Sequence, residues 1–169
     1  MAAGIPTRIV VTDANIIINL IHAGRLGLMG ALPPYEFVVP EDVVSEITDP
    51  DQRQALEAAI TAGQLRRESI EVPAELTRYA ELRQVIGKGE AASLALAESR
   101  GWLIASDEKG RFRREVLAGL GAGRLMTTPG LFVLAIRAGA ISVAEADEAK
   151  AILEQHRFRM PFGSFGDVV

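Results

Sequence analysis

Residues 8–18 read Arg-Ile-Val-Val-Thr-Asp-Ala-Asn-Ile-Ile-Ile, and this stretch decides the fold. The β-branched run at residues 9–11 predicts a short buried strand, and the polar step at residues 12–15 separates it from an apolar helix. Asp13 is therefore expected at the carboxyl end of a strand, which is the edge of an open α/β sheet where ligands bind. A purely structural alternative stays open, in which Asp13 or Asn15 only caps the helix that follows.

Outward from this stretch, predicted strands and helices alternate along the chain. The expected strands are residues 8–12, 37–39, 66–72, 102–105 and 125–127. The expected helices are residues 14–22, a short turn around 43–47, a helix from Pro50 to Gly63, residues 73–85, residues 90–100, an arginine-rich helix after Asp107, one that Thr128 caps and Pro129 begins, and residues 143–156. This alternation predicts a parallel sheet with helices on both faces, in one three-layer α/β domain.

Composition narrows the classes of function. The 169 residues suit one domain with a full core, and the absence of cysteine excludes disulfides, thiolate metal sites and cysteine nucleophiles. The net charge of −4 argues against the broad basic surface of an avid DNA binder. No apolar run approaches the roughly 20 residues of a membrane span, and the first residues do not resemble a signal peptide. We therefore expect a cytoplasmic protein without a membrane partner.

Three acidic residues form the candidate site. Ser106-Asp107 ends the predicted fourth strand as Thr12-Asp13 ends the first, and Glu90 opens a helix that is apolar almost all round. Burying three like charges together costs energy unless a cation holds them, and carboxylate oxygens suit Mg²⁺ or Mn²⁺. Each acid alone has a simpler explanation, as a helix cap or a solvated side chain.

Other motifs carry little chemistry. The glycines at 119, 121 and 123 resemble a dinucleotide-binding loop but precede a strand, so we interpret them as a helix end and a turn. Gly87-Lys88-Gly89 lacks the upstream glycine and the Ser or Thr of a phosphate-binding P-loop. A phosphatase with an aspartate nucleophile needs an acid two residues on, where this chain has Asn15.

The pattern resembles the PIN domain family, in particular the small stand-alone proteins that include VapC-type toxins of toxin–antitoxin pairs. The resemblance rests on four motifs: Thr12-Asp13-Ala14-Asn15, Val43-Val44-Ser45-Glu46-Ile47, Gly89-Glu90-Ala91-Ala92-Ser93, and Ala105-Ser106-Asp107-Glu108-Lys109-Gly110-Arg111. It extends to the Thr128-Pro129-Gly130 turn. It implies a parallel sheet of four or five strands and a metal-dependent ribonuclease that hydrolyses RNA phosphodiester bonds.

The resemblance also implies the parts of the site. Asp13, Glu90 and Asp107 are the expected catalytic residues, and the metal ligands for Mg²⁺ or Mn²⁺ are Asp13, Glu46, Glu90 and Asp107. Where relatives often carry a further acid, this chain has Ser106, which leaves Glu108 as its substitute or as a solvated side chain. Asn15, Ser106 and Thr128 are expected to orient the carboxylates. Lys109, Arg111, Arg113 and Arg114 either contact the RNA backbone or form a solvated helix face.

Alternative functions and partners follow from the same residues. A PIN-like module could bind RNA or protein without cutting. An acidic phosphoacceptor domain would need a central lysine near the site, and none is evident at the end of the predicted fifth strand. An antitoxin protein is the expected partner if the chain is a toxin. Residues 1–157 are expected to form the nuclease domain, and residues 158–169 an aromatic tail that packs on the body, a second subunit or a partner. We also expect a homo-oligomer.

Overall fold

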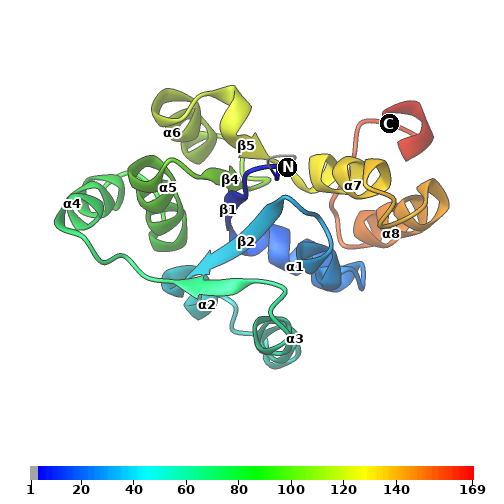
Figure 1. Ribbon diagram of the computed structural model, residues 1–169, viewed down its shortest axis with the longest axis horizontal. Helices are drawn as coiled ribbons and strands as arrows, with labels where there is room; N and C mark the ends of the chain where they lie inside the picture. The colour runs from blue at the N-terminus through cyan, green and yellow to red at the C-terminus, as the bar shows by residue number, and fades with distance from the viewer. Residues whose placement is uncertain (1–3) are drawn as a thin grey trace.

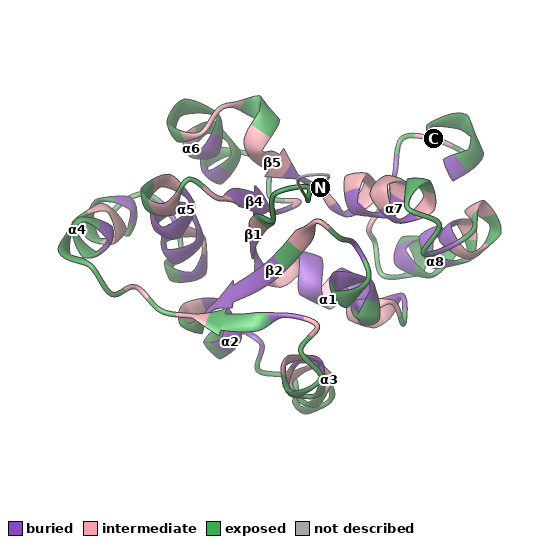
Figure 2. Ribbon diagram, in the orientation of Figure 1, coloured by how far each residue is buried: buried purple, intermediate pink, exposed green. Residues whose placement is uncertain are grey.

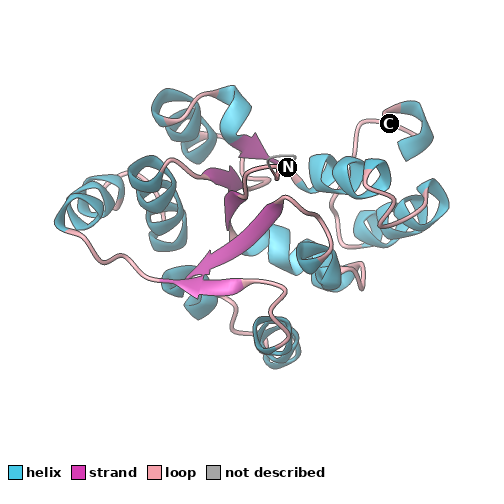
Figure 3. Ribbon diagram, viewed as in Figure 1, coloured by secondary structure: helices cyan, strands magenta, loops and turns pink. Residues whose placement is uncertain are grey.

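The centre of the computed structural model, which describes residues 4–169, is a five-stranded parallel sheet in the order β3-β2-β1-β4-β5. The strands are β1 (Arg8–Thr12), β2 (Tyr35–Pro40), β3 (Arg66–Glu68), β4 (Leu103–Ala105) and β5 (Leu125–Met126). Figure 3 shows them in magenta between the helices. The chain adds β2 and β3 on one side of β1, and β4 and β5 on the other. The point where the strand order reverses therefore lies between β1 and β4, where α/β sheets bind ligands.

Helices cover both faces of this sheet (Figure 1). The α-helices are α1 (Ala14–His22), α2 (Glu41–Glu46), α3 (Pro50–Thr61), α4 (Pro73–Leu82), α5 (Lys88–Arg100), α6 (Arg111–Gly119), α7 (Thr128–Arg137) and α8 (Val143–Gln155). Short 3-10 turns are η1 (Leu26–Gly30), η2 (Ala122–Arg124) and η3 (Phe165–Asp167). In Figure 1, α4, α5 and α6 lie on one side of the sheet, and α1, α3, α7 and α8 lie on the other. The expected three-layer architecture is confirmed.

Residues that alternate along the strands belong to two separate cores. Figure 2 shows buried residues, in purple, in the strands and in helices on both sides of the sheet. Val10 of β1 belongs to the core under α1, α3, α7 and α8, whereas its neighbour Val11 belongs to the core under α4, α5 and α6. Successive residues of a strand point to opposite faces, so a parallel sheet buried on both faces needs continuous apolar runs. Helix α5 is buried from Ala91 to Ala97, as its nearly uniform apolar sequence predicts.

Local signals located most elements, and the differences have physical causes. The third strand ends at Glu68 and does not reach Val72, because its neighbour β2 ends at Pro40, which pairs with Glu68. Helix α7 is capped by Thr127, whose Oγ1 accepts the Gly130 N–H at 3.2 Å. The prediction that Thr128 is the cap was wrong, since Thr128 is the first helical residue.

Helix α5 begins two residues earlier than predicted, at Lys88, with Gly87 as its N-cap. The glycine-rich segment at 119–123 is a helix end and a turn, as interpreted: α6 ends at Gly119, and Gly121 has a φ of 86°. The last helix carries the predicted capping box, in which the Glu145 N–H donates to Ser142 Oγ and the Ser142 N–H donates to Glu145 Oε2.

The aromatic tail packs on the protein's own body. Phe165 is fully buried beside Phe132 of α7, with the ring centroids 5.6 Å apart. Asp147 of α8 accepts hydrogen bonds from Ser164 Oγ at 2.6 Å and from the Phe165 N–H at 2.8 Å. Within residues 4–169, no helix combines the length and the apolar character that crossing a bilayer requires.

Candidate active site

Asp13 lies at the end of the central strand, next to the end of β4. Its backbone N–H continues the sheet by donating to Ala105 O at 3.0 Å, which places Ser106 beside it. The residue is only 4% exposed. Oδ1 accepts the Ala14 N–H at 2.8 Å, and Oδ2 accepts the Ser106 hydroxyl at 2.9 Å. Asp13 thus caps α1, as the structural alternative proposed, and one of its oxygens also faces the switch point between the strands.

Asp107 is held by a different set of donors. Its Oδ1 accepts the Thr128 N–H at 2.8 Å, and its Oδ2 accepts the Thr128 hydroxyl and the Asn19 side-chain N–H at 3.0 Å. These bonds come from the first turn of α7 and from the middle of α1. Thr128, one of the residues predicted to orient the carboxylates, donates two of these bonds. Because α1 and α7 are distant in sequence, only the folded chain brings these groups together.

Asn15 links the two aspartates. Its Oδ1 accepts the Asp107 N–H at 3.1 Å, and its Nδ2 donates to Asp13 Oδ2 and to Glu108 Oε1, both at 3.3 Å. Ser106 completes the connection, since its Oγ also accepts the Glu108 N–H at 3.1 Å. The amide of Asn15 and the hydroxyl of Ser106 therefore fix the relative positions of three acidic residues.

Glu90 and Glu46 come from two further helices, α5 and α2. Glu90 is in the first turn of α5 and is partly exposed. Glu46, the last residue of α2, is exposed, and its Oε1 accepts the Gly89 N–H at 2.9 Å. Glu46 thus satisfies a free backbone donor at the N-terminus of α5, where negative charge is favoured.

The pKa values of three of these acids are raised, and neighbouring carboxylates contribute to each shift. Burial, opposed by hydrogen bonds from Ala14 and Ser106, raises the pKa of Asp13 to about 6, with further contributions from Glu108 and Glu46. Burial together with the charges of Asp13, Glu108 and Glu46 raises the pKa of Glu90 to about 6. The pKa of Asp107 is also raised, by burial and by Glu108, although Thr128 and Asn19 oppose the change. The charge of Glu108 contributes to the raised pKa of all three residues.

A divalent cation fits this donor chemistry. The side chains offer carboxylate oxygens. Burial first, and neighbouring carboxylates second, raise the pKa of Asp13 and of Glu90, and a bound cation would stabilise the ionised form of both. Within residues 4–169, no three Asp, Glu or His side chains are arranged to hold one ion as they stand. The contacts bring Asp13, Asp107 and Glu108 together around Asn15, while the carboxylate of Asp107 is turned toward Thr128.

The predicted substrate-contacting cations have different surroundings. Lys109 is exposed and lines an open groove of about 680 Å³ that also contains Asp107 and Glu108. Arg111 forms an ion pair with Glu115 at 3.0 Å, one turn along α6. This contact agrees with the alternative in which Arg111 belongs to a solvated helix face. Sequence reasoning missed Asn19, a buried amide in the run Ile-Ile-Ile-Asn-Leu. Its position four residues after Asn15 on one helix was the available signal.

A model of the PIN domain family matches residues 9–164. The chain belongs to the PIN domain family. The PIN domain is also similar in fold to the crystal structure of VapBC2 from Rickettsia felis bound to a DNA fragment from its promoter. The sequence identity is 16%, the TM-score is 0.47, and the match covers 71% of this chain and 97% of that chain.

A second solved structure, PAE2754 from Pyrobaculum aerophilum, is 17% identical to this PIN domain, with a TM-score of 0.48 and coverage of 80% of this chain and 91% of that chain. No curated protein matches this PIN domain. The family model includes all four motifs on which the resemblance was based, because they lie between Thr12 and Arg111.

Proposed function

We propose that this PIN domain is a ribonuclease that uses Mg²⁺ or Mn²⁺ to hydrolyse RNA phosphodiester bonds. The observation that supports it best is the group of acids at and beside the switch point of the sheet: Asn15 joins Asp13, Asp107 and Glu108, and burial, with neighbouring carboxylates, raises the pKa of Asp13 and of Glu90 to about 6. Strongly perturbed acids in such a position are typical of functional sites. Asp13, Glu90 and Asp107 would hold the ion, with Glu46 and Glu108 beside them.

The remaining groups have supporting roles in this proposal. A bound cation supplies a water of lowered pKa and offsets the negative charge of the phosphate. Ser106 and Asn15 hold Asp13, and Thr128 and Asn19 hold Asp107, so that the carboxylates keep their orientation during the reaction. Lys109, on the wall of the adjoining groove, would contact the RNA backbone.

Cleavage of a labelled RNA tests the proposal. We expect the purified protein to cut RNA with Mn²⁺ or Mg²⁺ and to be inactive in EDTA. Asp13→Asn should also be inactive, whereas Glu148→Gln, which removes an exposed charge from the first half of α8, should cut normally. Activity that survives thorough chelation would exclude the metal mechanism. RNA that is bound but never cut would instead favour a non-catalytic binding module.

We further propose that the protein acts as the toxin of a toxin–antitoxin pair, with a small antitoxin protein as its partner. The support is the family relationship. Controlled expression in a bacterial host should slow growth, and Asp13→Asn should relieve the effect. The gene beside this one should encode a small protein with a DNA-binding half. The expected homo-oligomer is tested by the mass in solution, measured by light scattering.

A further inference from the structure

A groove continues from the acidic site toward the C-terminal segment. It is lined by Asp107 and Glu108 of the site, by residues of α1 from Asn15 to His22, and by Arg157, Phe158 and Arg159, which follow α8 closely. Its volume of about 680 Å³ is open to solvent. Any extended molecule with one part at the acids would therefore meet the segment after α8 with another part.

The groove also carries three cations, one next to the acids and two in the segment after α8. Lys109, Arg157 and Arg159 are all exposed, and within residues 4–169 none of them forms an ion pair.

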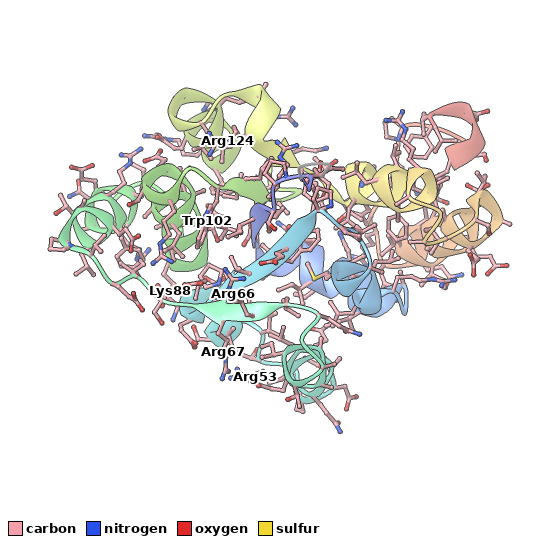
Figure 4. All side chains as sticks on the ribbon, viewed as in Figure 1. Arg53, Arg66, Arg67, Lys88, Trp102 and Arg124 are labelled. Carbon is pink, nitrogen blue, oxygen red and sulfur yellow. The ribbon has the colours of Figure 1, made fainter. Side chains whose placement is uncertain are left out.

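Arg53, Arg66 and Arg67, labelled in Figure 4 beside β3 and α3, provide the contrast. All three are ion-paired, with Glu57 as a partner of Arg53 and Arg67, and Glu36 as a partner of Arg66. In a chain of net charge −4, the cations of the groove are thus available to an anionic ligand.

Arg157 occupies a backbone position that favours glycine. Its φ is 65°, the only positive φ at a non-glycine residue within 4–169. It follows the C-cap of α8 in a Schellman motif: the Phe158 N–H donates to Leu153 O at 2.9 Å, and the Arg157 N–H donates to Glu154 O at 3.1 Å. A side chain with a Cβ is strained in this conformation. An arginine thus occupies a position at the groove where the backbone conformation favours glycine.

Flat rings lie next to these cations. His22 and His156 also line the groove, and their rings are stacked with centroids 3.7 Å apart and an interplanar angle of 11°. His156 is the exposed member of the pair, and Phe158 is half-buried. Cations that follow a backbone, together with rings on which bases stack, are the two features of surfaces that bind single-stranded nucleic acid.

We propose that this groove binds single-stranded RNA, with phosphates at Lys109, Arg157 and Arg159 and with bases against His156 and Phe158. The inference rests on the proposed ribonuclease function and extends it, because it assigns a path for the strand beyond the cleaved bond. The C-terminal segment thereby becomes part of substrate binding as well as part of the core.

Arg157→Gly is the variant that tests the groove. It removes the guanidinium and at the same time relieves the positive φ, so the fold is kept or stabilised. Affinity is measured by fluorescence anisotropy with a labelled single-stranded RNA of about 12 nucleotides, in EDTA and about 50 mM salt. Arg159→Ala is the second variant. Arg137→Ala is the matched control, because Arg137 is an exposed cation at the opposite end of α7 from Thr128.

We expect Arg157→Gly and Arg159→Ala each to weaken RNA binding about five-fold or more. Each should also reduce the slope of log affinity against log salt by about 0.7, the value for one lost phosphate contact. The melting temperature of Arg157→Gly should equal or exceed that of the wild type, and Arg137→Ala should bind as the wild type does.

The proposal is wrong if the wild-type protein binds no RNA. It is also wrong if both groove variants bind RNA as tightly as the wild type, and a protein would then be the better candidate ligand for the groove. Because binding is measured without metal, it is independent of the proposed reaction. If binding falls in the variants and the protein never cleaves RNA, the groove assignment stands and the ribonuclease proposal fails.

Discussion

Asp13 caps α1 and is also a carboxylate of the candidate site. The pH dependence of stability distinguishes these two roles. The carboxyl has a pKa of about 6 in the folded protein, against 3.8 as the ordinary value, mainly because it is buried. Its protonated form is therefore favoured by folding. The resulting stability is complete below about pH 4 and is lost as the pH rises through 6, which amounts to roughly 3 kcal/mol at neutral pH.

We accordingly expect Asp13→Asn to be as stable as the wild type or more stable at pH 8 in EDTA. The difference should shrink toward pH 5, where the wild-type carboxyl binds its proton. Thermal melts across this range measure it. The pKa of His22 is lowered, mainly by burial, so His22 changes stability in the opposite direction, but equally in both proteins. A variant that is less stable by the same amount at every pH would show that Asp13 acts only as a cap.

Metal binding gives a second prediction at the same residues. If Asp13 and Asp107 are ligands, Mn²⁺ at 100 times its dissociation constant should stabilise the wild-type protein by roughly 2.7 kcal/mol. Asp13→Ala and Asp107→Asn should show much smaller shifts. Melting temperatures with and without Mn²⁺ provide the comparison, and Glu148→Gln serves as the control. Equal shifts in all the proteins would mean that these acids do not bind the ion.

At the scale of elements, the start of α5 depends on a side chain from α2. A Cβ built on Gly89 would lie 2.5 Å from Glu46 Oε2, so only glycine allows Glu46 to reach the Gly89 N–H. Gly89→Ala should therefore displace Glu46. Because Glu46 is exposed and alanine favours helices, we expect the free energy of unfolding to change by less than about 1 kcal/mol.

Glu46→Gln is the matching variant, since glutamine keeps the oxygen that caps α5 and removes the charge. If Glu46 helps to hold the metal as proposed, both variants should weaken metal-dependent cleavage. A Glu46→Gln protein that cleaves normally would leave Glu46 with the capping role alone. Cleavage rates over a range of Mn²⁺ concentrations distinguish these outcomes.

The elements also show which features of the fold and of the site the sequence predicts and which it does not. Strand β1 and helix α1 agreed with the prediction, because alternation, capping and apolar runs are local signals. The end of β3 depended on the length of its neighbour β2, and the placement of Thr128 depended on Asp107, 21 residues earlier. Asn19 was missed for the same reason, since its partners Asp107 and Thr128 come from other elements.

At the scale of the whole molecule, the C-terminal segment completes the core. Phe165 is fully buried, and Met160, Phe158 and Phe162 pack against the same core. We expect Phe165→Ala to cost about 3–5 kcal/mol, and removal of residues 158–169 to expose apolar surface on α7 and α8. Urea unfolding and binding of a hydrophobic dye measure these effects. Removing only the exposed Val168 and Val169 is the control, and a long truncation as stable as the wild type would contradict the prediction.

The position of β1 at the centre of the sheet has a consequence for hydrogen exchange. Its backbone is paired on both sides, with β2 and with β4, whereas the edge strands β3 and β5 have three and two residues. Amide protons of the edges exchange when those strands fray, but those of Val10 and Val11 exchange only when the whole sheet opens. We therefore expect the candidate catalytic aspartate to follow the slowest-exchanging strand of the sheet, so that opening of either edge leaves it in place.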